Sequence, residues 1–332
     1  METIDFTAIA KPLLNWYHHS ARILPWREQP TPYRVWVSEI MLQQTRVSAV
    51  VPYFMRFMEA LPTVETLAGA PEEQLLKLWE GLGYYSRVRN LQRAAQVLMK
   101  DYGGRLPERP EELIRLPGIG PYTAGAISSI AYGHPSPAVD GNVLRVMTRL
   151  AADPVNTSAP EGKKRVTAWV AAAMPADSAS AFTQGLMELG ATVCLPNGDP
   201  LCELCPLASL CQARRLGTQT EFPVKEVKKA RRIEERTVFL LVCGRRVALH
   251  KRPSKGLLAG LWEFPSTLGY LGMDEARTFL LGEGLAPLQL KPLPPAKHIF
   301  THKEWQMRGY LVRIEEETGP YSFVTPEELA AD

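Results

Sequence analysis

The chain has 332 residues, 45% of them hydrophobic, and its formal net charge of +3 neither requires nor excludes a nucleic acid partner. This length allows two domains with hydrophobic cores, and the mixed composition excludes a largely disordered chain. The sequence contains no apolar run long enough to span a bilayer and begins without the features of a signal peptide, so we expect a cytoplasmic protein.

Apolar residues at helical spacing predict one helix over residues 5–20 and a second helix from Tyr33 to Arg46. In the second helix Glu39 and Gln43 share a stripe with Arg46, opposite the residues that face the core. A glutamate on a helix is most often an ordinary surface residue. Glu39, Gln43 and Gln44 nevertheless lie together among many apolar residues, which makes them candidates for a functional site.

A second candidate segment runs from Trp79 to Arg87 and reads WEGLGYYSR. Gly81 and Gly83 predict a turn that presents Tyr84 and Tyr85. Aromatic side chains beside glycines and arginines are suited to stacking against DNA bases, although core packing remains an alternative for one of the two tyrosines.

The third segment reads LPGIGPYTAGA from Leu116 to Ala126 and lies within a predicted helical hairpin at about 112–130. Gly118 and Gly120 have no side chain to block close approach, so the turn can offer backbone amides to a phosphate at the start of the next helix. Asp140 follows twenty residues after Gly120, at the start of another predicted helix. Taken alone, the turn could also be an ordinary corner between helices.

The turn and Asp140 resemble the helix-hairpin-helix and the catalytic aspartate of the endonuclease III superfamily of DNA base-excision glycosylases. The segment from Trp36 to Thr45 matches, residue for residue, the WVSEIMLQQT signature of the MutY-type adenine DNA glycosylases. Many superfamily members that also cleave the DNA strand carry a lysine where this chain has Tyr122. Without that amine we expect a monofunctional glycosylase that removes the base with water.

The resemblance implies that two carboxyl groups have different roles in catalysis. Glu39, among apolar residues, is expected to be protonated and to donate to N7 of adenine, while Asp140 stays ionised and stabilises the oxocarbenium ion of the sugar. Tyr122 and Asn142 are expected to orient Asp140 or the attacking water. The other residues expected to contact DNA or the base are Arg27, Gln43, Gln44, Thr45, Leu82, Tyr84, Gly118, Gly120 and Gln184.

Gln44 and Tyr84 are expected to fill the gap that the flipped adenine leaves in the duplex. Gln184 takes the place where the family presents a side chain to that adenine. Its carboxamide offers a donor and an acceptor together, which matches the paired groups on the edges of adenine.

Four of the five cysteines lie in a loop over 194–211, as Cys194, Cys202, Cys205 and Cys211. In a reducing compartment this spacing indicates a zinc ion or an iron–sulfur cluster in preference to disulfides. The loop resembles the cluster loop of endonuclease III and MutY, which implies a [4Fe–4S] cluster, with zinc as the alternative. The first gap has seven residues where the family usually has six, so we expect an enlarged loop.

Basic residues predict a linker over 217–235, and alternating apolar residues then predict strands. Residues 251–265 resemble the entry to a Nudix-type domain, but the carboxylates of a Nudix magnesium site do not follow them, so we expect no diphosphate hydrolysis. The family uses this domain to recognise 8-oxoguanine through a loop that typically reads Phe-Ser-His. Here the loop is Phe300, Thr301 and His302.

The sequence therefore predicts an α+β protein, with a helical glycosylase domain at 1–216, the linker at 217–235 and a Nudix-like domain at 236–332. The expected activity is removal of adenine opposite 8-oxoguanine or guanine in double-stranded DNA, by a monomer associated with the nucleoid. The alternatives are an endonuclease III-like pyrimidine glycosylase with lyase activity, a non-catalytic sensor of DNA damage and, more remotely, a Nudix hydrolase.

Overall fold

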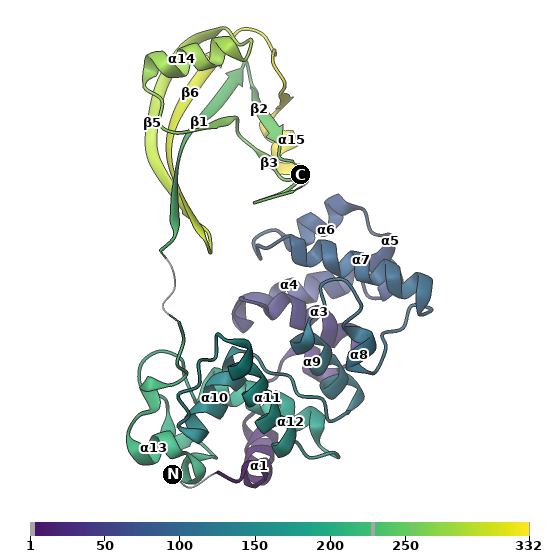
Figure 1. Ribbon diagram of the computed structural model, residues 1–332. Helices are drawn as coiled ribbons and strands as arrows, with labels where there is room; N and C mark the ends of the chain where they lie inside the picture. The colour runs from purple at the N-terminus through teal and green to yellow at the C-terminus, as the bar shows by residue number, and fades with distance from the viewer. Residues whose placement is uncertain (1–3, 227–229, 254, 332) are drawn as a thin grey trace. The chain divides into compact units, whose positions relative to one another are not determined.

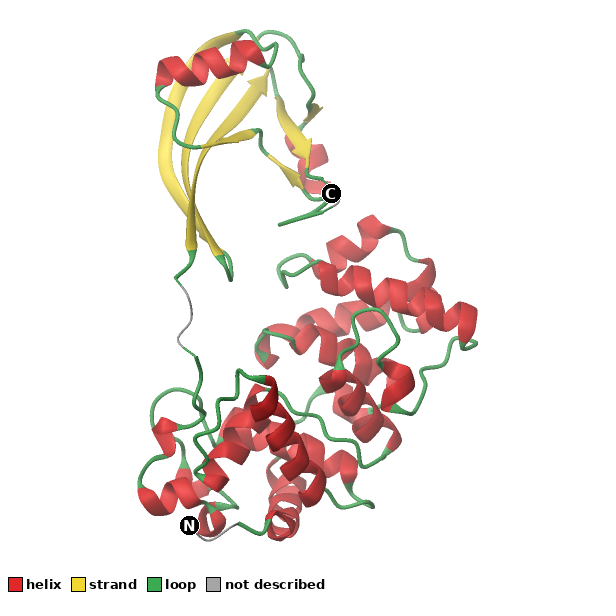
Figure 2. Cartoon of the chain, viewed as in Figure 1, coloured by secondary structure: helices red, strands yellow, loops and turns green. Residues whose placement is uncertain are grey.

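The structure, a computed structural model, describes residues 4–226, 230–253 and 255–331. The chain divides into two compact units, Met1–Glu226 and Val227–Asp332. Helices make up the first unit and a mixed sheet with helices makes up the second, which confirms the expected α+β class (Figures 1 and 2). The division falls within the expected linker, of which residues 227–229 lie outside the described residues. No helix in the described ranges has the length and apolar character needed to cross a membrane.

Proline and capping residues start several helices of the first unit. Pro32 and Pro121 occupy the first turns of α3 and α9, where the missing amide proton is no loss, and the Thr31 hydroxyl accepts from the amide of Arg34 at the start of α3. The elements of this unit are η1 (Phe6–Ile9), α1 (Ala10–Ser20), α2 (Pro25–Glu28), α3 (Pro32–Leu42), α4 (Val47–Ala60), α5 (Val64–Gly69), α6 (Glu72–Trp79), α7 (Ser86–Asp101), α8 (Pro110–Leu113), α9 (Pro121–Tyr132), α10 (Gly141–Ala151), α11 (Pro160–Ala173), α12 (Ala179–Thr192), η2 (Cys202–Leu204), η3 (Ala208–Leu210), α13 (Gln212–Leu216) and η4 (Gln219–Glu221).

Two large hydrophobic cores lie within the described part of the first unit, beside a small cluster of Ala152, Ala213 and Phe222. One is built from residues 24–138, with Trp36, Phe54 and Trp79 wholly or almost wholly buried. The other joins Ile9 and Leu13 near the amino end to α10, α11 and α12, so α1 packs against α12, which lies far from it in sequence, as well as against η1. Helices α9 and α12 contact each other and bring the two cores together.

Helix α3 runs through the first core and buries its residues from Tyr33 to Met41, Arg34 excepted. Our prediction that this helix reaches Arg46 is wrong, since it ends at Leu42. The buried guanidinium of Arg87 donates to the carbonyl oxygens of Ile40, Met41 and Gln43 at 2.9, 3.1 and 2.7 Å. These acceptors are the ones that a further helical turn would use, so the chain leaves the helix there.

The helical hairpin consists of α8, a turn and α9. Gly118 has a φ of +77°, and a Cβ atom at this position would lie 2.7 Å from Cβ of Asn90. A glycine is required here both by the backbone conformation and by the packing. Gly120 precedes α9, and a Cβ added there would meet no atom within 4 Å, so its backbone faces open space.

The second unit is built on one mixed sheet with the strand order β3-β2-β1-β6-β5, in which β1 and β6 are parallel and β5 and β6 antiparallel. Ala276 and Leu280 of α14 pack into its core beside Phe239 and Val312. The elements are β1 (Arg232–Cys243), β2 (Arg246–Lys251), β3 (Trp262–Glu263), β4 (Ser266–Leu268), α14 (Met273–Gly282), β5 (Pro287–Ile299), β6 (Lys303–Ile314), β7 (Ser322–Val324) and α15 (Pro326–Ala331).

Candidate active site

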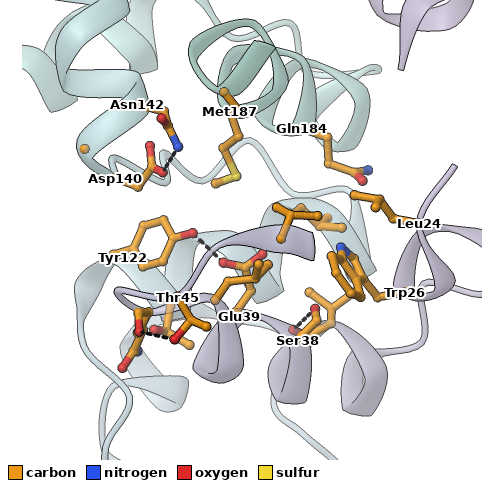
Figure 3. Close-up of a pocket in the computed structure, with 18 of the residues that line it drawn as sticks. Leu24, Trp26, Ser38, Glu39, Thr45, Tyr122, Asp140, Asn142, Gln184 and Met187 are labelled. Atoms are coloured by element: carbon orange, nitrogen blue, oxygen red, sulfur yellow. Dashed lines mark hydrogen bonds between the residues drawn. The ribbon is translucent and has the colours of Figure 1, made fainter. Parts of the chain in front are cut away.

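A pocket of about 660 Å³ lies in the first unit, between α3 and α9 of the first core and α10 and α12 of the second. Figure 3 shows Glu39 and Tyr122 on one side, and Asp140 with Asn142 and the α12 residues Gln184 and Met187 on the other. The pocket brings together most of the residues that the sequence singles out in this unit. Those that line it are Arg27, Glu39, Gln43, Gln44, Thr45, Gly118, Gly120, Tyr122, Asp140, Asn142 and Gln184.

Glu39 is a buried carboxyl group, only 5% exposed. Burial raises the pKa of Glu39 to about 7 and the nearby charge of Asp140 contributes to the rise, whereas the Tyr122 hydroxyl and Arg27 oppose it. Tyr122 donates a hydrogen bond to Oε2 of Glu39. A carboxyl group with this pKa holds its proton close to neutral pH and can therefore act as an acid.

Asp140 occupies the amino-terminal cap of α10. Its Oδ1 accepts from the backbone amide of Val143 at 2.8 Å, and its Oδ2 accepts from Nδ2 of Asn142 at 2.8 Å. Burial raises the pKa of Asp140, while these two hydrogen bonds and the charge of Arg145 oppose the rise. Fixed donors at both oxygen atoms, beside the positive end of a helix, favour the ionised form.

The sequence predicts that Tyr122 and Asn142 both orient Asp140 or the attacking water. In the structure they bind different carboxyl groups. Asn142 donates to Asp140 and accepts from Nη2 of Arg145 at 2.9 Å. Tyr122 instead donates to Glu39, which lies 83 positions earlier in the chain. The sequence places Tyr122 closer to Asp140, and only the packing of α9 against α3 brings its hydroxyl to Glu39.

Gln44 and Tyr84 form a hydrogen-bonded pair at the surface. The Tyr84 hydroxyl donates to Oε1 of Gln44 at 2.9 Å, and both residues have positive φ, 60° for Gln44 and 51° for Tyr84. Left-handed backbone at residues other than glycine is strained and is often found at functional sites. Tyr84 is 47% exposed, whereas Leu82 is buried at 7% and both lie outside the lining of the pocket.

Arg87, which we did not single out from the sequence, connects the segment before Gln44 with the segment before Tyr84. Besides the carbonyls at the end of α3, its guanidinium donates to the carbonyl oxygens of Leu82 and Gly83, both at 3.0 Å. Burial lowers the pKa of Arg87 to about 10. The sequence feature that could have identified Arg87 is its place at the end of the WEGLGYYSR segment.

Arg22 and Glu188 were also not predicted to belong to the site. The Glu188 side chain is fully buried and accepts from Arg22 and from Arg27. Glu188 lies one helical turn after Gln184 and is surrounded by apolar residues on α12, which was a readable sign of a buried carboxylate. Gln184 itself is held by Ser180, with Nε2 at 3.3 Å from the serine hydroxyl.

The four cysteines of the 194–211 loop all line one small cavity of about 30 Å³. Nη1 of Arg149 donates to Sγ of Cys194 at 3.3 Å, and burial raises the pKa of Cys205 to about 12. Among the described residues, no three His, Cys, Asp or Glu side chains are arranged to hold a single metal ion. Four inward-facing thiols with a guanidinium beside one of them fit a group that binds thiolates and displaces their protons.

In the second unit, Phe300, Thr301 and His302, the residues expected to recognise 8-oxoguanine, form the tip between β5 and β6. We call them the reader residues. The amide of Phe300 donates to the carbonyl of Lys303 at 2.8 Å, which closes the turn. The Phe300 ring packs edge-on against His298 and Trp305, with ring centroids 4.5 and 4.9 Å apart. Thr301 and His302 are exposed at this tip.

Comparisons with known proteins agree with this architecture. Residues 37–171 match the model of the HhH-GPD superfamily base excision DNA repair proteins, and residues 237–332 match the NUDIX domain model. The human adenine DNA glycosylase is 36% identical over 98% of this chain and 70% of the human protein. That of Buchnera aphidicola subsp. Baizongia pistaciae is 37% identical over 87% of this chain and 82% of its own.

Among solved structures, a trapped covalent intermediate of endonuclease III with DNA aligns with 65% of this chain and 99% of its own, with a TM-score of 0.54 and 26% identity. The resemblance inferred from the motifs is therefore confirmed, as is the Nudix-like character of the second unit. The protein is a DNA N-glycosylase of base excision repair, and the chain belongs to the adenine DNA glycosylase family.

Proposed function

We propose that this enzyme removes adenine from double-stranded DNA where it is mispaired with 8-oxoguanine or guanine, by hydrolysis and without strand cleavage. The observation that carries the proposal is the pair of carboxyl groups in one pocket with different hydrogen-bonding environments. Glu39 has a raised pKa of about 7 and one hydroxyl partner, whereas Asp140 accepts from two fixed donors. One carboxyl group that can donate a proton and one that stays ionised are suited to the cleavage of a glycosidic bond.

DNA is the expected partner, as in the endonuclease III complex that the first unit resembles. The half-buried Gly120 at the start of α9, where an added Cβ would meet no atom within 4 Å, and the exposed Gly118 before it suit a DNA phosphate. Adenine must leave the duplex to reach the pocket, at the expense of stacking and pairing. Gln44 and Tyr84 then occupy the gap in the duplex, with Leu82 supporting the loop from beneath.

In the pocket, the neutral adenine is a poor leaving group until it receives a proton. Glu39 donates its proton to N7, and the electron pair of the glycosidic bond moves to the base. Asp140 stabilises the positive charge that develops on the sugar. Water then attacks the sugar carbon and gives up a proton, which a carboxylate of the pocket accepts; Glu39, ionised after protonating the base, is one such acceptor. Tyr122 holds the Glu39 carboxyl group, and Asn142 holds Asp140. We assign contacts with the adenine and its flanking backbone to Arg27, Gln43, Thr45 and Gln184.

Tyr122 gives a reason for proposing a monofunctional enzyme. A lyase needs an amine that forms a Schiff base with the sugar. Tyr122 has no amine, and its hydroxyl donates a hydrogen bond to Glu39. Borohydride trapping on DNA would reveal a lyase through a covalent adduct, and we expect none.

We assign the glycosylase domain to the first unit and the recognition domain to the second. The expected linker at 217–235, between domains at 1–216 and 236–332, is too long, because the first unit extends to Glu226 and β1 already begins at Arg232. The enzyme is proposed to act as a monomer, in the compartment that holds the DNA, which in a bacterial cell is the cytoplasm. Phe300, Thr301 and His302 are proposed to read the base opposite the adenine, because two of them are exposed at the tip of a hairpin that Phe300 anchors.

Replacing Thr301 with Ala is expected to reduce the preference for 8-oxoguanine over guanine by about tenfold, because one hydrogen bond to the lesion is lost. Thr301→Ser keeps the hydroxyl and should keep the preference, and Thr278→Ala on the exposed face of α14 is the matched control. The measurement is the ratio of single-turnover rates on the two duplexes. An unchanged ratio in Thr301→Ala would remove the reader role.

We propose that Cys194, Cys202, Cys205 and Cys211 bind a [4Fe–4S] cluster. Four thiols face one cavity, and Arg149 lies close enough to Cys194 to balance thiolate charge. When bound, such a cluster cross-links the loop through its four thiolates and so contributes to the stability of the second core.

The purified protein is therefore expected to be yellow-brown, with a broad absorbance shoulder at the edge of the visible range and about four iron atoms per chain. Removal of the iron with a chelator and an oxidant should lower the melting temperature, because the loop loses its cross-link. Metal analysis decides between the alternatives, since a colourless protein with one zinc ion per chain would replace the cluster by zinc.

The function itself is tested by single-turnover release of adenine from duplexes with adenine opposite 8-oxoguanine, guanine or thymine. We expect the fastest release opposite 8-oxoguanine and no release opposite thymine on the same timescale. Tight DNA binding without release of adenine from any duplex would favour a damage sensor, and release of an oxidised pyrimidine would favour an endonuclease III-like activity.

A further inference from the structure

Glu188 is a buried carboxylate that faces the active-site pocket. Its side chain is 0% exposed, and Glu188 is among the residues that line the pocket. It lies on α12, from which Met187 projects toward Tyr122 and Glu39, and Gln184 toward Leu24 (Figure 3). A fully buried carboxylate is rare unless hydrogen bonds and opposite charges offset its loss of hydration. The partners of Glu188 therefore indicate its role.

Two arginines satisfy both oxygen atoms of Glu188. Arg22 donates to it from its backbone amide at 3.1 Å, from Nε at 2.6 Å and from Nη2 at 2.9 Å. Arg27 donates from Nη2 at 2.9 Å and also from Nη1 to the carbonyl oxygen of Arg22 at 3.1 Å. Glu188 thus connects α12 to the segment 22–27, which belongs to the other wall of the pocket and lies more than 160 positions away.

We propose that Glu188 is a positioning residue that holds Arg27 in the wall of the pocket and offsets the arginine charges, so that Glu39 remains able to carry its proton. This inference rests on the proposed role of Glu39 as the acid. Glu188 is not assigned any contact with the reacting atoms, and it acts through Arg27 and Glu39.

The charges around Glu39 explain why an offset is needed. Tyr122 of α9 donates to Glu39, and the charge of Asp140, at the start of α10, favours the protonated form. Arg27 of α2 favours the ionised form. A further uncompensated cation in the pocket wall would act in the same direction. Arg87 of α7 binds the carbonyls at the end of α3, and from α4 the residue that lines the pocket is the apolar Val47.

Glu188 lies on the remaining wall. Without its negative charge, Arg22 and Arg27 would present two uncompensated positive charges to the pocket. These charges would favour an ionised Glu39, which cannot donate a proton.

The test is the pH dependence of single-turnover adenine release. Activity that requires a protonated Glu39 falls as the pH rises through the pKa of this residue, which defines the alkaline limb of the profile. Glu188→Gln should move this limb to lower pH by about one unit, because the arginine charges are no longer offset. Arg22→Gln removes one positive charge and keeps the pair of Glu188 with Arg27, so it should move the limb to higher pH. That shift should be smaller, because the Arg22 side chain is 38% exposed and water screens its charge.

Glu72→Gln is the matched control, since it removes an exposed ion pair with Arg89 and should leave the limb unchanged. Opposite shifts in the two variants support the inference, because a general loss of stability cannot move the limb in both directions. If Glu188→Gln does not fold alone, the double variant Glu188→Gln/Arg22→Gln removes one charge of each sign and is compared with Arg22→Gln, from which its limb should lie at lower pH. Limbs that stay in place, or that move in the same direction, would overturn the inference.

The same experiment separates this inference from the proposed function. A parent enzyme without an alkaline limb, together with an active Glu39→Gln variant, would refute the role of Glu39. Suppose instead that Glu39→Gln abolishes the alkaline limb, whereas Glu188→Gln and Arg22→Gln leave it at the parent pH. That result would refute the inference about Glu188 and leave the role of Glu39 intact.

Discussion

Replacing Glu39 with Gln is expected to lower the rate of adenine release by about 10³-fold, which is within the usual contribution of a general acid. Glutamine has no acidic proton that it can transfer to N7, but its carbonyl oxygen can still accept from the Tyr122 hydroxyl. The shape of the pocket and the binding of the duplex should therefore be retained. Single-turnover release and a DNA-binding titration on the same preparation measure the two effects.

The same substitution is expected to stabilise the protein in alkaline solution. The pKa of Glu39 is about 7 in the folded state, against an ordinary value of 4.5, so the folded state binds the proton more tightly. The stability that this proton contributes is complete below about pH 4.5 and is lost as the pH rises to about 7. At pH 8 the ionised, buried Glu39 therefore destabilises the parent by up to roughly 3 kcal/mol, which the neutral side chain of the Glu39→Gln variant would not do.

Urea unfolding at pH 5 and pH 8 measures this difference. The variant should gain stability over the parent mainly at pH 8. Glu59→Gln, on the exposed side of α4, is the control and should change neither stability nor rate. An active Glu39→Gln enzyme, or a variant whose gain in stability is the same at both pH values, would contradict the assignment.

Replacing Asp140 with Asn is the second change with a large expected effect. The oxygen of an asparagine can still accept from the amide of Val143, so the cap of α10 is kept. Its amide nitrogen, however, would face the Nδ2 donor of Asn142, and the negative charge that stabilises the oxocarbenium ion is gone. We expect a loss of rate of about 10³-fold, similar to the effect of removing one electrostatic stabiliser in other enzymes.

Thermal unfolding and duplex binding distinguish this loss from misfolding, since both should change little. The exposed Asp177 provides the matched control, because Asp177→Asn also removes one carboxylate from the same unit. A rate within tenfold of the parent in Asp140→Asn would show that the charge on the sugar is stabilised elsewhere.

Several features were readable from short stretches of sequence. The WVSEIMLQQT signature indicated Glu39, the LPGIGPY turn indicated the hairpin, and the spacing of four cysteines indicated the loop that encloses a cavity. Both the family and the α+β class are confirmed by the comparisons and by the fold. These features could be predicted because each depends on residues that are neighbours in the chain, where turn chemistry and helical spacing operate.

The end of α3 could not be predicted in the same way. Helical periodicity continues through Gln43 and Arg46, but Arg87 competes for the carbonyl oxygens at the end of the helix. This competition involves residues more than 40 positions apart and leaves Gln44 in a left-handed conformation beside Tyr84. Local propensity contains no information about such a partner.

The sequence by itself determined the family, the two carboxyl groups, the four cysteines and the division into a helical part and a part with strands. Only the tertiary structure decided which partner each of these groups has. Tyr122 binds Glu39 rather than Asp140. Glu188 binds two arginines that lie more than 160 positions before it in the sequence. The physical reason is that a pKa depends on burial and on nearby charges, and both are set by helices that meet only when the chain folds.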